Sequence, residues 1–306
     1  MTYVDDGGPV EITIPQLLEK ILPGDVLVIN NTQVLKRRVF ADNLEILFLK
    51  QLNDPLEWEV LFPSKALKVG AEVLLPLGQK MTLIEKGRPQ KIRTQEILTE
   101  AYFEKVAELP LPPYIQKARG ERHNVSDDSS WYQTAWAEKP GSLAAPTASL
   151  HFSNQDLELL KNRGVQVEFI TLHVGLGTFL PLTVEAVEKK TLHFESVEIS
   201  EKTWNVIQTA KKNGHPIWAL GTTVTRSLES AAIKNELKFE TDLFIQPGFE
   251  YKIVDRLLTN FHQPESSLLA LVMAFSGVDK VKNVYKWAIE NKMKLFSYGD
   301  LSVWKK

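Results

Sequence analysis

The periodicity of the sequence changes twice along the chain, and this limits the folds that are open to it. Residues 26–29 form a continuous aliphatic run typical of a buried strand, and short strand-like runs separated by turn residues then fill residues 37–109. After about Tyr132, strand-like runs alternate with amphipathic helical patterns, which is typical of a mostly parallel sheet with helices on both faces. We therefore predict an α/β fold: a large three-layer α/β sandwich, residues 1–36 plus 110–306, with a small β-barrel or β-sandwich domain, residues 37–109, inserted into it.

Composition and charge narrow the class of function. The 306 residues are 43% hydrophobic and 24% charged, as in a folded globular protein, and their formal net charge is −2. A nucleic-acid partner would therefore need a local basic patch. The sequence has no cysteine, which excludes disulfides, thiolate metal sites and a cysteine nucleophile. It shows neither a signal-peptide pattern nor an apolar run as long as a membrane span. A cytoplasmic protein without a membrane partner is expected, and a monomer is favoured.

Three segments share one design, in which a buried strand ends in a turn of small and polar residues. They are residues 27–32, 169–179 and 217–226. Because ligands of open α/β sheets bind beyond the carboxyl ends of the strands, we expect these turns at one edge of the sheet. Gly175 and Gly177 of the second segment would let a ligand approach the backbone. A lone Gly-x-Gly is weak evidence, however, and it lacks the third glycine of a dinucleotide fingerprint.

The third segment has the strongest pattern. Gly221, Thr222 and Thr223 follow a strand and open a helix, whose free N–H groups suit an anionic group such as a carboxylate. Arg226, one turn further on, can bind a carboxylate through two nitrogens. In the alternative interpretation, which the pattern alone favours, a threonine merely caps the helix and Arg226 lies on the surface.

Other polar groups are less specific. His193 and Glu195 are two positions apart on an extended segment, which puts them on one face and suits acid–base work, although a solvated pair on an edge strand is favoured by spacing alone. Residues 259–264 precede the most apolar helix, and residues 296–300 lie near the C-terminus; each is either a ligand loop or an ordinary cap or turn. The six histidines are scattered, so no metal site is expected.

Further segments fall in a fixed order and cover nearly the whole chain. They include Ala-Ala-Pro-Thr at 144–147 and Thr-Leu-His-Val-Gly at 171–175, and the full set is 25–32, 132–134, 140–152, 171–179, 193–195, 221–229, 259–264 and 296–300. Each motif is weak alone, but the ordered set is highly specific. It resembles the S-adenosylmethionine:tRNA ribosyltransferase-isomerase family.

The resemblance implies both a fold and a reaction. The fold is a large α/β sandwich interrupted by a small β-barrel. The reaction transfers the ribosyl part of S-adenosylmethionine to the aminomethyl group of 7-aminomethyl-7-deazaguanine at the wobble position of tRNA. Rearrangement to the epoxycyclopentane of epoxyqueuosine follows, and adenine and methionine leave. The expected cosubstrate is thus S-adenosylmethionine, which is consumed, the expected partner is that tRNA, and no metal is needed.

Site residues follow from the resemblance as hypotheses. The expected catalytic residues are His173, His193, Glu195 and Arg226. The expected substrate-binding residues are Tyr132, Gln133, Thr147, Gly175, Gly177, Thr178, Gly221, Thr222, Thr223, Asn260, His262, Tyr298 and Asp300.

Each group has an expected role. Arg226 and the turn 221–223 would hold the methionine carboxylate, and the turn 175–178 would admit the nucleoside. One of the two catalytic histidines, or the catalytic glutamate, would remove the ribose C5′ proton, which the neighbouring sulfonium acidifies. Tyr132 and Gln133 would contact the deazaguanine or its flanking nucleotides.

The chain also departs from the family pattern. Glu265 stands where a lysine usually follows Asn-Phe-His-x-Pro, and the Gly-rich loop of the barrel is reduced to residues 41–43. The residue before Lys65 is Ser64, and the N-terminal segment with an Arg-Asp pair and a Ser-Arg-Leu-Leu strand is missing. Glu265 and the missing N-terminal segment favour two alternatives: a non-catalytic paralogue that binds S-adenosylmethionine or a nucleoside, and a transferase acting on another acceptor.

Overall fold

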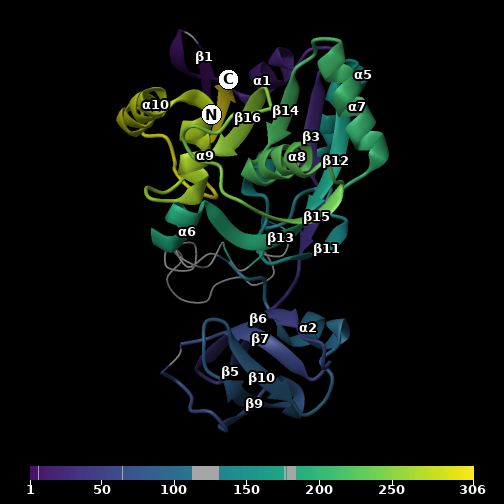
Figure 1. Cartoon of the computed structure of the whole chain (residues 1–306), viewed down its shortest axis with the longest axis vertical. Coiled ribbons are helices and arrows are strands. Elements are labelled where there is room, and N and C mark those ends of the chain that lie inside the picture. Colours follow the sequence, from purple (N-terminus) through teal and green to yellow (C-terminus); the bar gives the residue numbers. More distant parts are fainter. Residues whose placement is uncertain (6, 64, 112–130, 176, 178–183) are drawn as a thin grey trace. The chain divides into compact units, whose positions relative to one another are not determined.

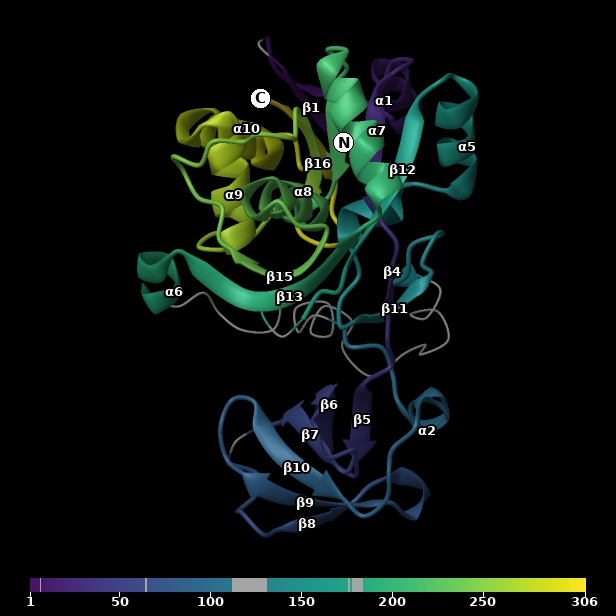
Figure 2. The same ribbon diagram turned by 45° about the vertical axis from the view of Figure 1, so that its right-hand side comes forward.

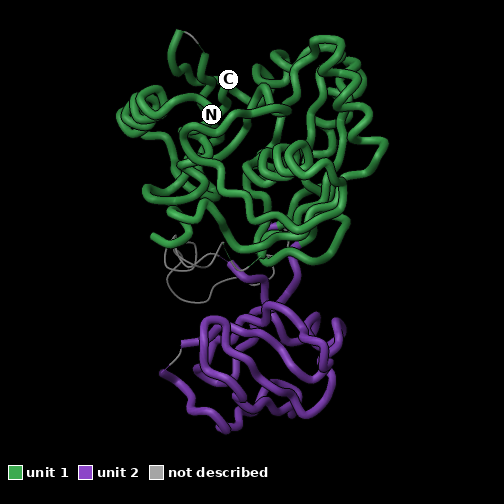
Figure 3. The backbone as a smooth tube through the Cα atoms, viewed as in Figure 1, with its two compact units in different colours: residues 1–33, 133–306 green, residues 34–132 purple. Residues whose placement is uncertain are grey.

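The chain divides into two compact units, of which the second interrupts the first (Figure 3). The computed structural model describes residues 1–5, 7–63, 65–111, 131–175, 177 and 184–306. The large unit comprises residues 1–33 and 133–306, and the small unit comprises residues 34–132. The predicted insertion, residues 37–109, falls within the small unit, and its boundaries stay a prediction.

The large unit is built on a nine-stranded sheet. In spatial order its strands are β15 (Lys238–Leu243), β13 (Thr191–Ile199), β12 (Gln166–Leu172), β3 (Val26–Asn30), β14 (Ile217–Leu220), β16 (Arg256–Asn260), β17 (Leu301–Lys305), β1 (Thr2–Asp5) and β2 (Gly8–Glu11). The four central strands, β12, β3, β14 and β16, run parallel to one another. The strands β17 and β1 are parallel to each other. Figure 2 shows β13 and β15 side by side at one edge.

The prediction of a mostly parallel sheet was wrong for the outer strands. Antiparallel pairs join β12 to β13, β13 to β15, β16 to β17, and β1 to β2. Between β16 and β17 the chain forms two helices, α9 (Ser267–Ser276) and α10 (Val278–Glu290). A single crossover helix returns the chain to the end of the sheet from which a parallel strand can start. The second helix brings the chain to the other end of the sheet, so β17 runs antiparallel to β16.

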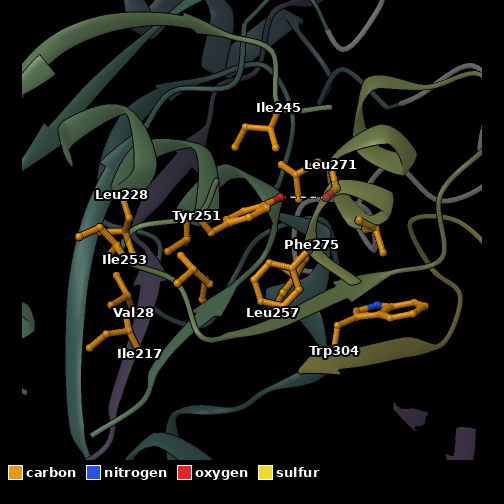
Figure 4. Packing of buried hydrophobic residues seen from close by; sticks show 14 of the residues in the cluster. Val28, Ile217, Leu228, Ile245, Tyr251, Ile253, Leu257, Leu271, Phe275 and Trp304 are labelled. Atoms are coloured by element: carbon orange, nitrogen blue, oxygen red, sulfur yellow. Dashed lines mark hydrogen bonds between the residues drawn. The ribbon is translucent and has the colours of Figure 1, made fainter. Parts of the chain in front are cut away.

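Helices cover both faces of this sheet, which confirms the three-layer sandwich (Figure 1). The strand β3 alternates its side chains, so that Val28 packs beneath α8 (Thr222–Lys234) and its neighbours while Leu27 packs on the other side. One face carries α7 (Glu201–Lys212), α8, α9 and α10, and the other carries α1 (Ile14–Lys20) and α5 (Asn154–Asn162). Figure 4 shows part of the first layer, in which the Tyr251 hydroxyl donates to the carbonyl of Leu271 across 2.8 Å.

Helix starts follow local sequence rules. Ser153 caps α5, and the Asp156 carboxylate in turn accepts the backbone N–H of Ser153. The same capping box joins Thr13 and Gln16 at the start of α1, with proline in the first turn. The short helix α6 (Val184–Lys189) leads into β13.

The small unit is a barrel-like six-stranded sheet, which confirms the inserted β fold. Its antiparallel order is β5 (Arg38–Ala41), β6 (Leu44–Gln51), β7 (Glu57–Leu61), β10 (Gln90–Thr94), β9 (Lys80–Glu85) and β8 (Glu72–Leu74). Register shifts between β6 and β7 and between β9 and β10 bend the sheet. Helix α2 (Glu100–Val106) contributes Phe103, whose ring makes edge contacts with Phe48 and Trp58 in the core.

Candidate active site at the strand ends

Four turns meet at one edge of the large sheet. Because β12, β3, β14 and β16 run parallel, their carboxyl ends lie at the same edge. The segments at these strand ends contain residues 173–175, 30–32, 221–223 and 260–262. The edge predicted from three strands therefore receives a fourth turn, after β16.

Asn30 joins the ends of β3 and β12. Its side-chain amide donates to the carbonyl of Leu172 across 3.0 Å, and its side-chain oxygen accepts the N–H groups of Leu172 and Thr32, each across 3.1 Å. The side chain is fully buried. Asn30 thus fixes the start of the turn that carries His173.

The imidazole of His173 is held between a hydroxyl and a glycine. Its Nδ1 lies 2.8 Å from the Oγ1 of Thr32, and a Cβ added to Gly141 would lie 2.7 Å from the ring. Burial lowers the pKa of His173, and the charge of Glu198 partly opposes this shift. The backbone N–H of His173 donates to the carbonyl of Ser196 on β13.

Arg226 and Glu195 form a buried ion pair. The Nη2 of Arg226 donates to Oε2 of Glu195 across 2.6 Å, and Oε1 of Glu195 accepts the backbone N–H of Gly175 across 3.0 Å. Only 8% of Arg226 and 7% of Glu195 are exposed, so neither is a solvated surface residue. The Nε of Arg226 is buried and has no hydrogen-bond partner among the described residues.

His193 and Glu195 do not share one environment. His193 is exposed and Glu195 is buried. The pairing of β13 with β15 shifts register between Thr191 and Glu195, which interrupts the simple alternation assumed from the sequence. His193 lies instead against the second glycine of the Gly-x-Gly turn, since a Cβ on Gly177 would lie 3.4 Å from the Cβ of His193.

The N-terminus of α8 has no side-chain cap. Gly221, with φ of 100°, is the N-cap residue, so the alternative interpretation in which a threonine caps this helix was wrong. The Oγ1 of Thr223 is buried and has no hydrogen-bond partner within the described part of the chain. Thr222 is 7% exposed. The N–H groups of the first turn are therefore available to an anion.

The turn after β16 contacts two further segments, the short helix η2 (Thr147–His151) and the loop that contains Gly299. Thr147, in η2, donates to Oδ1 of Asn260 across 2.9 Å, while the amide of Asn260 lies 3.4 Å from Nε2 of His151 and 3.4 Å from the carbonyl of Gly299. Burial lowers the pKa of His151. No role for His151 was predicted, although it lies within the motif at residues 140–152 that contains Thr147.

His262, at the end of this turn, makes contacts that suit a structural role as well as a ligand-binding role. Its Nε2 lies 2.8 Å from Oγ1 of Thr259, and its backbone N–H donates to the hydroxyl of Tyr285 across 2.7 Å. Burial lowers the pKa of His262 to about 4. The imidazole is therefore neutral at pH 7.

The other expected residues differ in placement. Tyr298 is 39% exposed, and Oδ2 of Asp300 accepts the backbone N–H of Lys294 within its own turn. Tyr132 is buried in the small unit, Gln133 is half-buried in the large unit, and Thr178 lies outside the described residues.

Two broader features concern ligands. The residues that the structure describes contain no cluster of histidine, aspartate and glutamate suited to a metal ion. Across the same ranges, no helix is both long enough and apolar enough to cross a bilayer.

Comparisons with known proteins agree over most of the chain. A family model described as "Queuosine biosynthesis protein" matches residues 4–303. An S-adenosylmethionine:tRNA ribosyltransferase-isomerase from Halothermothrix orenii is 42% identical over 309 residues, which cover 96% of this chain and 88% of that protein. The crystal structure of an S-adenosylmethionine tRNA ribosyltransferase from Thermotoga maritima is similar, with a TM-score of 0.53 and 27% identity, over 98% of this chain and 89% of that one.

Proposed function

The chain belongs to the queuosine biosynthesis protein family, and we propose that it is an enzyme, an S-adenosylmethionine-dependent tRNA ribosyltransferase-isomerase. It transfers the ribosyl part of S-adenosylmethionine to 7-aminomethyl-7-deazaguanine at the wobble position of tRNA, and the product is epoxyqueuosine. The observation that carries this proposal is the 42% identity to such an enzyme over 96% of the chain. A tRNA substrate would place the protein in the cytoplasm.

The first turn of α8 binds the methionine carboxylate. Three features support this assignment: the uncapped N-terminus, the helix dipole, and the buried Thr223 hydroxyl without a partner among the described residues. Arg226 adds a positive charge one turn further along α8, and the ion pair with Glu195 balances part of this charge. The carboxylate would supply the acceptor that the Thr223 hydroxyl lacks.

His193 is the candidate that best suits removal of the C5′ proton. Both carboxylate oxygens of Glu195 are already engaged, one by Arg226 and the other by the Gly175 N–H. His193 is exposed beside Gly177, where the nucleoside would approach. Its imidazole takes the proton from C5′, and the adjacent sulfonium of S-adenosylmethionine stabilises the carbanion that is left.

A single-turnover assay tests the proposed function. Purified protein, S-adenosylmethionine and tRNA carrying the aminomethyl-deazaguanine are mixed, and adenine release and nucleoside mass are followed. Adenine release together with the mass of epoxyqueuosine is the expected result. Binding of S-adenosylmethionine without any release would contradict it and favour the non-catalytic paralogue.

One observation favours a transferase with another acceptor. Glu265 places a negative charge where the family usually has a lysine, and it is exposed. A carboxylate there repels the phosphates of tRNA. Adenine release with a different acceptor, and none with tRNA, would support this second function.

A further inference from the structure

Thr32 has a fully buried hydroxyl with one partner. Its Oγ1 lies 2.8 Å from Nδ1 of His173, and the residue is 0% exposed. No other hydrogen bond of this hydroxyl occurs among the described residues. The nearby side-chain oxygen of Asn30 accepts the backbone N–H of Thr32. The hydrogen between the two side chains therefore decides the protonation pattern of His173.

Two arrangements of that hydrogen differ in what they leave unpaired. If Nδ1–H donated to Thr32, the hydroxyl hydrogen would be buried without an acceptor, which typically costs about 1–3 kcal/mol. If Thr32 donates to Nδ1, only lone pairs on the hydroxyl oxygen stay unused, and buried acceptors tolerate this better than donors do. The second arrangement is favoured, and in a neutral imidazole it puts the ring hydrogen on Nε2.

The surroundings hold the ring in this position. Gly141 packs against the Nδ1 edge of the imidazole, where any larger residue would collide with it. The backbone on both sides is held: Val174 donates to Oγ of Ser142 across 2.9 Å, and Asn30 bonds the N–H and the carbonyl of Leu172. The Nε2 atom makes no hydrogen bond with any described residue and is not among the buried unpaired atoms.

We propose that His173 is held as the neutral Nε2–H tautomer and donates a hydrogen bond to a ring nitrogen or ribose oxygen of bound S-adenosylmethionine. It does not act as the base. This inference rests on the proposed function and assigns a specific task within the same site. Burial, which lowers the pKa of His173, keeps the ring neutral, and Glu198 is the charged residue that opposes this effect. His173 is then the hydrogen-bond donor, and the exposed His193 removes the proton.

The tautomer is measured directly by nitrogen NMR on the full chain labelled with ¹⁵N-histidine. The chain has only six histidines, and the His173 signals are identified by their loss in His173→Gln. We expect hydrogen on Nε2 in the wild type and in Thr32→Ser, which keeps the hydroxyl. In Thr32→Val, which removes the donor at similar volume, the Nδ1–H form should appear. Hydrogen on Nδ1 in the wild type would overturn the proposal.

Substitution of His173 separates donor from base. Glutamine carries an amide N–H near the position of Nε2 and cannot act as a base, whereas leucine offers neither function. We expect kcat/KM of His173→Gln to stay within about tenfold of the wild type, and that of His173→Leu to fall by about 10²–10³. If glutamine reduces turnover as far as leucine does, His173 is not a donor.

Failure of the proposed function itself gives a different result. A protein that releases no adenine still has a measurable tautomer, and S-adenosylmethionine alone then serves as the probe. The Nε2 resonance should shift when this probe binds, and binding should weaken more in His173→Leu than in His173→Gln. An unchanged Nε2 resonance on saturation would contradict the contact.

Discussion

The Nη2 of Arg226 and the Oε2 of Glu195 lie 2.6 Å apart in a buried ion pair that joins α8 to β13. The second carboxylate oxygen accepts the N–H of Gly175, so the pair also fixes the turn after β12. A pair of this kind positions its neighbours more than it stabilises the fold, because removing both charges from water is costly.

Removal of one charge should therefore be much more harmful than removal of both. We expect Glu195→Leu to lower the free energy of unfolding by about 3–5 kcal/mol, since Arg226 becomes a buried charge without a partner. The double variant Glu195→Leu/Arg226→Leu should recover part of this loss. Urea unfolding measures both, with Glu158→Ala as the control, because its exposed pair with Lys161 contributes at most about 0.5 kcal/mol. Equal losses in Glu195→Leu and Glu158→Ala would contradict the interpretation.

Substitution of two threonines in α8 tests ligand binding separately from the stability of the helix. Thr223→Val removes a buried hydroxyl without a partner among the described residues, so stability should hardly change while KM for S-adenosylmethionine rises about tenfold or more. Thr225→Val is the matched control, because the Thr225 hydroxyl already donates to the carbonyl of Gly221 across 3.2 Å. The assignment of the carboxylate to this turn does not survive an unchanged KM in Thr223→Val.

A methyl group at Gly141 should displace the imidazole of His173. The added Cβ would lie 2.7 Å from the ring, and misplacement of a positioned group by about 1 Å can reduce turnover by about 10²-fold. Gly248→Ala is the control, because Gly248 also has a positive φ but its Cβ would meet no atom within 4 Å. We expect both variants to fold and only Gly141→Ala to lose activity. Comparable losses in the two would point to backbone strain.

His262 should make stability depend on pH below neutrality. The unfolded chain takes up a proton near the usual pKa of 6.5, whereas the folded chain does so only near pH 4. The free energy of unfolding therefore falls as the pH is lowered between these values, by at most about 1.4 kcal/mol per pH unit. Chemical unfolding at several pH values checks this, and His262→Gln should show a shallower fall. Identical slopes would mean that His262 titrates normally.

A lysine at position 265 should strengthen binding of tRNA. Glu265→Lys replaces a repelled carboxylate by a group that can contact phosphate, and each added contact steepens the dependence of log affinity on log salt by about 0.7–0.9. Filter binding over a range of salt concentrations measures the slope. Glu240→Lys, an equal charge change at an exposed position of β15, is the control. Equal effects of the two would indicate a general charge effect.

Local sequence rules predicted the elements with strong patterns. The strand β3 was predicted because all its apolar side chains are buried, which gives an unbroken aliphatic run. Ser153 and Asp156 form the capping box that starts α5, and α8 begins at the Gly-Thr-Thr turn that was expected to open a helix.

Elements and contacts that depend on the tertiary fold could not be predicted from the sequence alone. The strands β16 and β17 are too short to show a period, and the alternation of β15 between Lys238 and Leu243 includes four polar residues. The pairing of Glu195 with Arg226 requires the order of the strands, and the register shift in β13 has no local signature.

The insertion after β3 also affects the order of folding. Asn30 and Leu172, which join β3 to β12, are 142 positions apart, and closing such a loop has a large entropic cost. Within the small unit, Arg38 pairs with Glu108, so that folding of this unit first would shorten the loop before the central sheet assembles. A small unit that forms early would thus hold the two ends of the insertion together. Slow formation of the central sheet would follow as a separate kinetic phase.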